Sequence, residues 1–404
     1  MMPPKPPMLL PRRARGRLIR WRRRGSDAPD GSRRVLILTA GVGAGHDGAA
    51  YELARRLRRC GVEVDVRDYL DALPAVGRRI VRDCYMPAVQ HTPRFFDWLF
   101  VSLEHRRWVQ LTVLRFCRLS EGVVRRWASG ADVVVSTYPL ASQTLGRLRA
   151  AGLLTVPAVT FLTDPAAHRM WCHPDVDMHL TVTSATVTDG SRYGVALRAA
   201  GALAEPRFSR SVLPADRARI RAELGVEGDE PVVLISAGSL GLGLVPDAVD
   251  AILRHPRVRV VVLCGRNESL RRRLATQDRV SALGWRDDVP DLMAAADALV
   301  HNAGGLSFTE ALVAGLPSIS YLAIPGHGRA NASVLAAAAL APWPSTPDEL
   351  AAAIDEVVAR PRAAPTPMVR PGQPDAAAMI LELIGPADAG DSSPAELTDA
   401  RRVG

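Results

Sequence analysis

The sequence predicts an α/β fold made of two doubly wound, parallel-sheet domains. Three observations support this prediction. The chain has 404 residues, of which 48% are apolar, and this is enough for two domains of ordinary size. Apolar strands alternate with helical segments in both halves, as they do in parallel sheets. Each half also has a glycine-rich turn directly after its first strand, where doubly wound domains bind ligands.

The first half begins with a strand, a helix and a second strand, and two further strands follow. The predicted elements are a strand at Val35–Thr39, a helix at Gly48–Cys60, and strands at Val62–Val66, Val133–Ser136 and Ala158–Leu162. The order of these elements is the signature of a parallel sheet.

The second half repeats this pattern after a linker. The linker is predicted at Gly201–Pro214, and the strands at Val232–Ser236, Val258–Leu263, Ala298–Val300 and Ser318–Tyr321. Beyond residue 361 the chain is rich in Pro and Ala, with one short helix at 375–384. The predicted segments are a flexible basic tail (1–31), a first domain (32–205), a second domain that includes the terminal helix (206–385) and a flexible tail (386–404).

The charge is concentrated at the N-terminus. Residues 1–34 hold eleven basic residues against two acidic ones, which equals the net charge of +9 of the whole chain. A basic tail on a neutral body argues against a nucleic-acid-binding fold and favours an arm that seeks an anionic surface, first of all the cytoplasmic leaflet of a membrane. A merely solvated tail and a wrongly assigned start codon remain open alternatives.

The five cysteines are scattered without a C-x-x-C pair, so the sequence predicts neither a disulfide framework nor a zinc ribbon. The N-terminus has no uninterrupted apolar signal segment, and nowhere do 18 apolar residues run together. We therefore expect a cytoplasmic protein without a membrane span.

The most informative stretch is 297–317, where an apolar strand leads through a small-residue turn into a helix. Gly304 and Gly305 let backbone N–H groups approach a ligand, and the positive end of the helix dipole favours phosphate there. Glu310 lies one turn further on, and the natural partner of a carboxylate beside a phosphate site is a neutral diol such as ribose. Together these features indicate a nucleotide. The alternative is an ordinary strand-to-helix turn with a solvated Glu.

The turn of the first half contains G-x-G-x-x-G at Gly43, Gly45 and Gly48, and Asp65 follows roughly twenty residues on, as in a nicotinamide-binding fold. That fingerprint leaves His46 unexplained. A helix N-terminus disfavours imidazolium, so His46 is expected to be neutral and suited to act as a general base. A histidine that only caps the turn is the alternative.

The second half opens with another loop able to bring N–H groups to a phosphate, which includes Gly238 and Ser239. The loop lacks the Lys of a P-loop, which argues against ATP hydrolysis. Trp285 follows a short strand and either borders a flat base or belongs to the core.

These motifs resemble family 28 glycosyltransferases. The family includes monogalactosyldiacylglycerol synthases, bacterial processive diacylglycerol glucosyltransferases and the N-acetylglucosaminyltransferase that makes lipid II. The resemblance covers roughly residues 33–340. On the donor side it rests on Gly238-Ser239, Gly284-Trp285, Gly304-Gly305 with Glu310, and Pro325-Gly326 followed by Asn331; on the acceptor side it rests on Gly43-Ala-Gly45-His46 and on Thr163-Asp164 with His168 and Trp171.

The resemblance implies a GT-B architecture, with an acceptor-side domain, a UDP-sugar-binding domain and a cleft between them. It implies His46 and Asp164 as catalytic residues, with His46 deprotonating the acceptor. The residues implied at the donor are Gly238, Ser239, Trp285, Gly304, Gly305, Ser307, Glu310, His327 and Asn331, and those of the acceptor loop are Gly43, Gly45, His168 and Trp171. No metal or other cofactor is expected, because the helix dipole and loop N–H groups stabilise the leaving UDP. Asp175-Val-Asp177 is accordingly expected to be a turn, and the histidines at 168, 173 and 179 match no standard zinc spacing.

The sequence departs from the family pattern at three places. Ala303 stands where many members have Pro, which loosens the turn. His327 and Arg329 stand where members have Gln and acidic residues, at the position expected for the sugar hydroxyls, so the donor sugar is undetermined. Residues 85–118 interleave aromatic and basic side chains, which suits either a membrane-interfacial surface or a domain core.

The sequence therefore predicts an inverting glycosyltransferase that moves a hexose or N-acetylhexosamine from a UDP-sugar to a diacylglycerol-like lipid hydroxyl, associated peripherally with an anionic membrane at its cytoplasmic face. Three alternatives differ in class. A UDP-N-acetylglucosamine epimerase of the same fold should carry more catalytic carboxylates in the first half. A non-catalytic nucleotide-sugar-binding protein would tolerate loss of His46. A nicotinamide oxidoreductase would use Asp65 and ignore Glu310.

Overall fold

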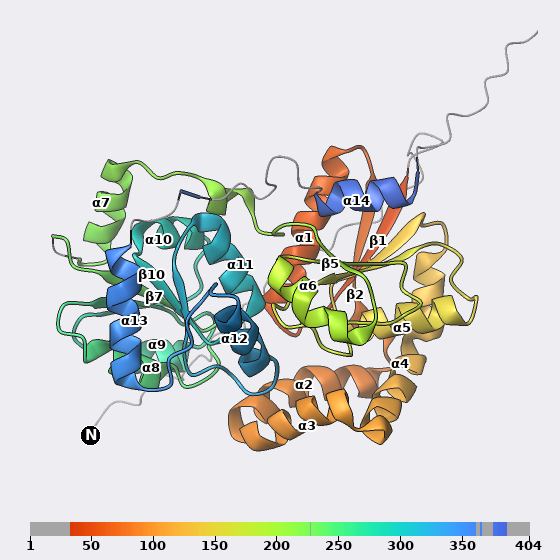
Figure 1. Cartoon of the computed structure of the whole chain (residues 1–404), viewed down its shortest axis with the longest axis horizontal. Coiled ribbons are helices and arrows are strands. Elements are labelled where there is room, and N and C mark those ends of the chain that lie inside the picture. Colours follow the sequence, from red (N-terminus) through yellow and green to blue (C-terminus); the bar gives the residue numbers. More distant parts are fainter. Residues whose placement is uncertain (1–32, 227, 361–363, 366–374, 386–404) are drawn as a thin grey trace, which may run out of the picture.

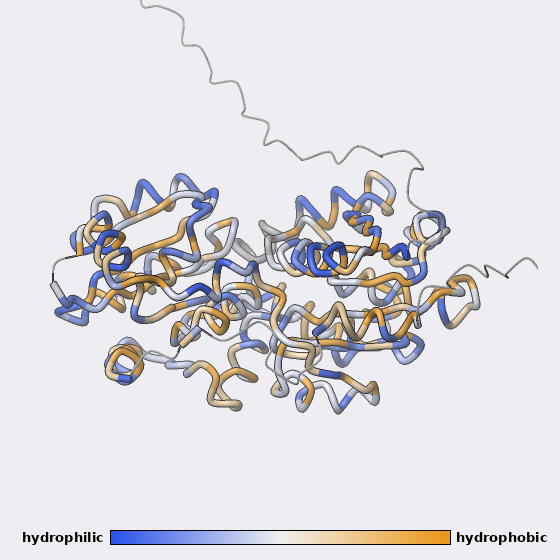
Figure 2. Tube along the Cα trace, turned by 90° about the horizontal axis from the view of Figure 1, so that it is seen from above, coloured by the Kyte–Doolittle hydropathy of each residue, from blue (hydrophilic) through white to orange (hydrophobic). Residues whose placement is uncertain are grey.

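The computed structural model describes residues 33–226, 228–360, 364–365 and 375–385. The predicted tails at 1–31 and 386–404 lie outside the described residues. The described chain forms two α/β domains that lie side by side (Figure 1). Hydrophobic residues follow the strands of both domains, and the surrounding helices alternate between hydrophobic and hydrophilic residues (Figure 2).

Six parallel strands form the first sheet, in the order β2-β1-β3-β4-β5-β6. They are β1 (Arg34–Thr39), β2 (Glu63–Asp68), β3 (Val133–Ser136), β4 (Ala158–Leu162), β5 (Met178–Thr181) and β6 (Leu197–Ala199). The helices of this half are α1 (Ala44–Arg59), η1 (Tyr69–Ala72), α2 (Ala75–His91), α3 (Pro93–His105), α4 (Arg107–Ala128), α5 (Pro139–Ala150), α6 (Ser184–Gly190) and η2 (Ser191–Tyr193). The central strands are buried on both faces, because α1 covers one face and α4 and α5 cover the other.

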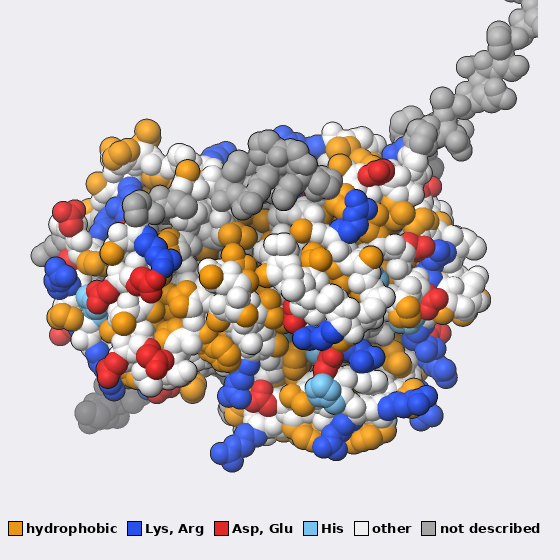
Figure 3. Space-filling model, viewed as in Figure 1, with side chains coloured by type: hydrophobic (Ala, Val, Ile, Leu, Met, Phe, Trp, Pro, Cys, Tyr) orange, Lys and Arg blue, Asp and Glu red, His pale blue; other side chains and the backbone are white. Residues whose placement is uncertain are grey.

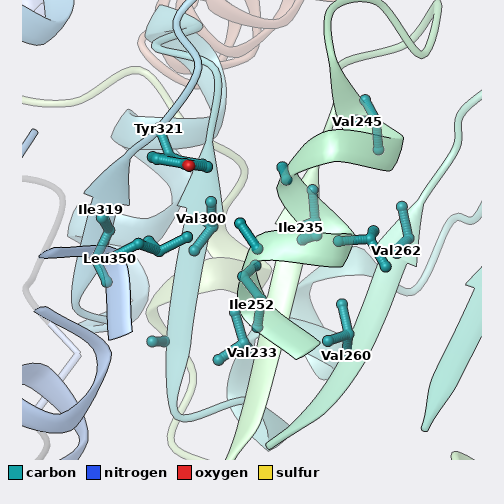
Figure 4. Close-up of a cluster of buried hydrophobic side chains, with 14 of the residues drawn as sticks. Val233, Ile235, Val245, Ile252, Val260, Val262, Val300, Ile319, Tyr321 and Leu350 are labelled. Carbon is teal, nitrogen blue, oxygen red and sulfur yellow. The ribbon is translucent and has the colours of Figure 1, made fainter. Parts of the chain in front are cut away.

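Five parallel strands form the second sheet, in the order β11-β10-β7-β8-β9. They are β7 (Val232–Ser236), β8 (Arg259–Leu263), β9 (Val280–Leu283), β10 (Ala298–His301) and β11 (Ser318–Ser320). The helices of this half are η3 (Pro206–Ser209), α7 (Pro214–Glu223), α8 (Val245–Leu253), α9 (Glu268–Leu274), α10 (Val289–Ala295), α11 (Gly305–Ala314), α12 (His327–Ala337) and α13 (Pro347–Ala359). Figure 4 shows one face of this sheet, where Val233, Val260 and Val300 pack against Ile252 of α8 and Leu350 of α13. The prediction of a GT-B arrangement of two Rossmann-like domains is confirmed.

Helices α2 and α3 lie below the rest of the molecule in the view of Figure 1, with α3 in contact with α12, and α4 leads from them back along the first domain. They contain the aromatic and basic segment at 85–118. Several large apolar side chains of this segment are exposed, including Phe95, Val101 and Trp108. Their exposure favours the surface interpretation of these residues over the core interpretation.

The connection between the domains is not a loose linker. Ala200 and Leu203 are buried in the core of the first domain, whereas Ala202 and Ala204 are buried in that of the second. The buried Arg56 of α1 donates a hydrogen bond of 2.7 Å to the carbonyl of Ala202. Residues of the segment 200–204 thus anchor the connection to both domains.

The terminal helix α14 (Ala376–Leu383) corrects one predicted boundary. The sequence analysis placed it in the second domain, but its residues Ala376, Met379 and Ile380 are buried in the core of the first domain, beside α1. The carboxylate of Asp375, which caps α14, lies 2.8 Å from a guanidinium nitrogen of Arg56. The apolar face of α14 and this ion pair therefore hold the helix on the first domain.

Candidate functional site

A cavity of about 280 Å³ lies between the domains, at the carboxyl ends of the central strands of both sheets. Doubly wound sheets bind ligands at this edge because the loops there connect strands to helix N-termini. The cavity brings together most of the predicted site residues: Gly43, Gly45, His46 and Asp164 from the first domain, and Gly238, Ser239, Trp285, Gly304, Gly305, Ser307, Glu310 and His327 from the second.

The second domain contributes a wall of small residues and backbone. Gly304 precedes α11 in an extended conformation with no side-chain cap, so the N–H groups at this helix start face the cavity uncapped by side chains. The hydroxyls of Ser236, at the end of β7, and Ser307 lie 2.8 Å apart. Gly238 has a φ of +70°, a left-handed conformation that glycine adopts without strain. These N–H and hydroxyl groups offer dipoles, which suit an anionic ligand. The charged side chains of this wall are Glu310 and Arg286, which pairs with Asp288.

Glu310 lies in the second turn of α11 and lines the same cavity. Burial, together with the negative charge of Glu205, raises the pKa of its carboxyl group to about 8. A raised pKa means that the surrounding protein groups solvate the carboxylate poorly. Two hydroxyls that donate hydrogen bonds to the carboxylate would supply that solvation.

The first domain contributes a wall of polar and aromatic side chains, with His46 in the first turn of α1. The Nδ1 atom of His46 lies 3.2 Å from the hydroxyl oxygen of Thr163. The ring also contacts the rings of Tyr138 and Trp171. Burial lowers the pKa of the imidazole, Asp164 raises it, and His327 lowers it. The net direction is downward, so His46 is neutral at pH 7 and able to accept a proton.

Asp164 is held from both domains. Trp171 Nε1 donates to its Oδ2 atom at 3.2 Å, and the Nδ2 group of Asn331, on α12, donates to its Oδ1 atom at 3.1 Å. Asn331 also donates to the carbonyl of Ala303 and accepts from the N–H of Ala166. The carboxylate is thus fixed beside His46, where it favours the imidazolium that forms when the ring takes a proton.

Three predicted site residues do not line the cavity. Asn331, predicted at the donor, is fully buried and bridges the domains instead. Trp171 is 2% exposed and lies beneath Asp164. His168 is also buried, with its Nε2 atom 3.3 Å from both Glu104 and the carbonyl of Phe100. These residues support the cavity wall from behind.

Two family models match the chain. A monogalactosyldiacylglycerol synthase model matches residues 46–198, and a model of glycosyl transferases group 1 matches residues 233–360. Both halves of the chain are therefore similar to glycosyltransferases, the first half to the diacylglycerol branch of family 28. The predicted resemblance is confirmed.

Individual relatives agree with this assignment. The processive diacylglycerol beta-glucosyltransferase of Bacillus subtilis is 26% identical over 317 residues, which cover 75% of this chain and 81% of that protein. The crystal structure of MurG from Acinetobacter baumannii has a TM-score of 0.53 and 18% identity, and the match covers 87% of this chain and 99% of MurG. HepE of Anabaena in complex with UDP-glucose has a TM-score of 0.50 and 17% identity, with 81% and 90% covered. The two structures show the shared GT-B fold.

The geometry disfavours the nicotinamide alternative. The carboxylate of Asp65 pairs with Arg67 at 2.7 Å and does not line the cavity. Gly45 and Gly48 instead face α11 of the other domain, since Cβ atoms on them would lie 3.8 Å and 3.1 Å from the side chain of Leu306. A Cβ atom on Gly305 would lie 2.3 Å from the carbonyl oxygen of Thr163. The glycines at both helix starts therefore allow the domains to approach each other.

The structure adds residues that the sequence analysis missed as site components. The guanidinium of Arg266 lies 4.6 Å from the ring centroid of Trp285, which is half exposed at the cavity. Asp97 on α3 contacts the loop before α12. Arg266 follows β8 by three residues and does not line the cavity, so it bears on the site only through Trp285. No local signal marks Asp97.

The described residues contain no group of three or more His, Cys, Asp or Glu side chains placed to hold a metal ion. Asp177 pairs with Arg149 at 2.6 Å and accepts from the N–H of Ala158, and Asp175 lies 3.5 Å from His173. Within the same described part of the chain, none of the helices has the length and apolarity needed to cross a membrane.

Proposed function

We propose that the chain is an inverting glycosyltransferase that moves a hexose or N-acetylhexosamine from a UDP-sugar to the hydroxyl of a diacylglycerol-like lipid. One observation carries this proposal: a neutral histidine, His46, and the N-terminus of α11 line one cavity from opposite domains. A base on one wall and an anion site on the other are what a displacement at the anomeric carbon needs.

The donor fits the second-domain wall. The diphosphate lies against the N–H groups of Gly304 and Gly305, and the helix dipole stabilises its charge. The ribose hydroxyls donate to the carboxylate of Glu310, which replaces the solvation that burial removes. HepE, which shares the fold, binds UDP-glucose, and this supports the choice of a uridine nucleotide.

The chemistry follows from this placement. The acceptor hydroxyl gives its proton to His46 as its oxygen bonds to the anomeric carbon. The bond between that carbon and the β-phosphate oxygen breaks, and its electron pair leaves with UDP. Asp164 stabilises the resulting imidazolium, since its charge raises the pKa of His46. Attack from the face opposite UDP inverts the anomeric centre.

We propose that this reaction uses no metal or other cofactor. The α11 dipole and the loop N–H groups then carry the charge of the leaving UDP. Adding a chelator should leave turnover unchanged.

The lipid acceptor is supported by the diacylglycerol-acting relatives and by the outer surface of α3 and α4. Phe95 and Val101 are each 54% exposed, and Trp108 is 60% exposed. Figure 3 shows Lys or Arg side chains among apolar ones along the lower edge of the molecule, where α2 and α3 lie. Apolar side chains among cations suit the interface of an anionic bilayer. We propose peripheral binding at the cytoplasmic face, with the basic residues 1–31 as a second anchor.

The test uses the full chain with anionic vesicles that contain diacylglycerol, and each of UDP-glucose, UDP-galactose and UDP-N-acetylglucosamine. Mass spectrometry should detect a glycolipid with at least one donor, and NMR should show the β-anomer from an α-linked donor. The His46→Ala protein is the matched control and should give almost no product. Absence of product with all three donors would contradict the proposed function, and an α-anomer would contradict inversion.

A further inference from the structure

Helix α3 presents two different faces. Its outer face carries the exposed Phe95, Trp98 and Val101. Its inner face carries Phe96, Asp97, Phe100 and Glu104 and contacts parts of the chain far away in sequence. Although α3 belongs to the first domain, part of this inner face contacts the second domain.

The inner face contacts residues 324–329, the end of the connection after β11 together with the first turn of α12, which we name loop 324–329. The Oδ1 atom of Asp97 accepts a 2.5 Å hydrogen bond from the N–H of Gly326, and its Oδ2 atom accepts a 2.5 Å bond from Arg329. The Asp97 side chain is 27% exposed and that of Arg329 is 57% exposed. One carboxylate from the first domain thus binds both a backbone group and a side chain of the second.

The contacted loop is part of the cavity wall, because Ile324 and His327 line the cavity. Its turn residue Gly326 has a φ of +70°, and a Cβ atom there would lie 3.0 Å from both Phe96 and Phe100. The His327 ring lies 6.2 Å from the ring of Phe96 and 6.5 Å from that of Phe100. The conformation of the loop therefore depends on α3.

The position of Arg329 in the sequence suggested a contact with the donor sugar, but Arg329 does not line the cavity. Its guanidinium is engaged with Asp97 outside the cavity wall. This leaves His327 as the polar side chain of the loop that faces the cavity.

We propose that Asp97 is a positioning residue for the donor sugar: from the acceptor-side domain it holds loop 324–329 of the donor domain, and so fixes His327 against the sugar. This inference rests on the proposed function, since it takes the donor to be a UDP-sugar. It assigns to α3 a role in donor binding in addition to the surface it presents to lipid.

The hydrogen bond to Gly326 is the decisive contact. An exposed ion pair such as Asp97–Arg329 contributes little by itself. A carboxylate that accepts from a backbone N–H makes a stronger, charge-assisted bond and fixes a turn that is already restricted to glycine. Removing the carboxylate should therefore have a larger effect than removing the arginine.

The first measurement compares the binding of UDP-glucose and of UDP by calorimetry, in the full chain and in variants. Asp97→Ala should weaken UDP-glucose binding about tenfold, the size expected for a lost hydrogen bond to a charged group, and leave UDP binding within about twofold. Asp97→Asn should lie between Asp97→Ala and the parent, and Arg329→Gln should have a smaller effect than either. The control is Asp71→Asn, which weakens a surface ion pair with Arg78. Neither residue lines the cavity, so this substitution should change neither affinity.

The second measurement follows hydrogen exchange of the peptide that contains residues 324–329, without any ligand. Asp97→Ala should expose the N–H of Gly326 and speed its exchange, whereas Asp71→Asn should not. If both UDP and UDP-glucose weaken equally, or if exchange at Gly326 is unchanged, Asp97 does not position this loop. If the parent binds no UDP-sugar at all, the donor assignment fails, and the exchange experiment still decides whether Asp97 holds the loop.

Discussion

The two walls of the cavity are built on different principles. The donor wall consists mainly of backbone and small residues at helix starts, such as Gly238, Gly304 and Gly305. The acceptor wall consists of His46 and Asp164, whose orientation depends on side chains around them. The donor wall therefore binds through dipoles that the fold itself supplies, whereas the acceptor wall reacts through groups that need partners. Substitutions in the two walls should separate binding from chemistry.

The largest separation is expected at His46. His46→Ala should reduce turnover by roughly two to four orders of magnitude, the range for loss of a general base, while UDP-sugar binding is kept. Because burial lowers the pKa of His46 below its ordinary value of 6.5, the acid limb of kcat/KM for the acceptor, measured at saturating UDP-sugar, should lie below that pH in the parent. Initial rates and calorimetry on the same preparations check both statements.

Asp65→Asn is the matched control for this experiment. Asp65 lies in the same domain but outside the cavity, where it pairs with Arg67. Its substitution should change neither turnover nor affinity. Equal turnover in His46→Ala and the parent would remove the proposed base from the acceptor wall.

On the donor wall, Glu310→Ala should weaken UDP-glucose binding by about 1 to 3 kcal/mol, the usual effect of removing a charged hydrogen-bonding partner. The catalytic rate at saturating donor should change less than the affinity. Calorimetry at constant pH tests this, and unchanged binding would exclude the ribose role of Glu310.

The raised pKa of Glu310 adds a pH dependence to the same comparison. In the free protein burial raises the pKa of this carboxyl group to about 8, and in the proposed donor complex the ribose hydroxyls donate to the carboxylate form. Binding therefore releases a proton, and affinity for UDP-glucose should rise as the pH increases toward about 8 and then level off. Glu310→Gln should remove this slope. Calorimetry in buffers of different ionisation enthalpy measures the released proton directly.

Behind the acceptor wall, Trp171→Phe keeps an aromatic six-membered ring but removes the five-membered ring whose N–H donates to Asp164. The bond is 3.2 Å long, so we expect a loss at the lower end of the range for a hydrogen bond to a charged group, about tenfold in kcat. UDP binding should stay unchanged, because Trp171 does not line the cavity. A parallel loss of UDP affinity would instead indicate a general disturbance of the domain contact.

The accuracy of the predicted elements also differs between regions of the molecule. The strands at Val133–Ser136, Ala158–Leu162 and Val232–Ser236 have the predicted bounds, because strands buried on both faces form continuous apolar runs. The strand Met178–Thr181 was missed because it contains His179, and Leu197–Ala199 because it has only three residues. Helix α1 begins at Ala44 rather than Gly48, although three glycines at 43–48 disfavour a helix there.

Glycine turns identify the donor wall in the sequence, because close backbone approach requires glycine at fixed offsets from a strand end. Side-chain partners carry no such local mark. Asn331 binds Asp164 across 167 positions of sequence, and family resemblance assigned it to the donor instead. The same holds for Asp97, which reaches Gly326 across 229 positions. Long-range hydrogen bonds of this kind become visible only when the two domains are placed together.

The smallest expected effect concerns His327, which belongs to the donor domain but packs against Phe96 and Phe100 of the acceptor domain. Burial lowers the pKa of its imidazole, so the neutral ring offers one donor and one acceptor to sugar hydroxyls. His327→Gln supplies a differently placed donor and acceptor. It should change the ratio of turnover on UDP-glucose, UDP-galactose and UDP-N-acetylglucosamine by roughly threefold to tenfold, because a polar group left unpaired by one sugar disfavours that sugar. Asn331→Ala is the control, since its contact with Asp164 should affect all three donors alike. If His327→Gln reduced turnover on all three donors by the same factor, His327 would have only a structural role, and other residues of the cavity would select the sugar.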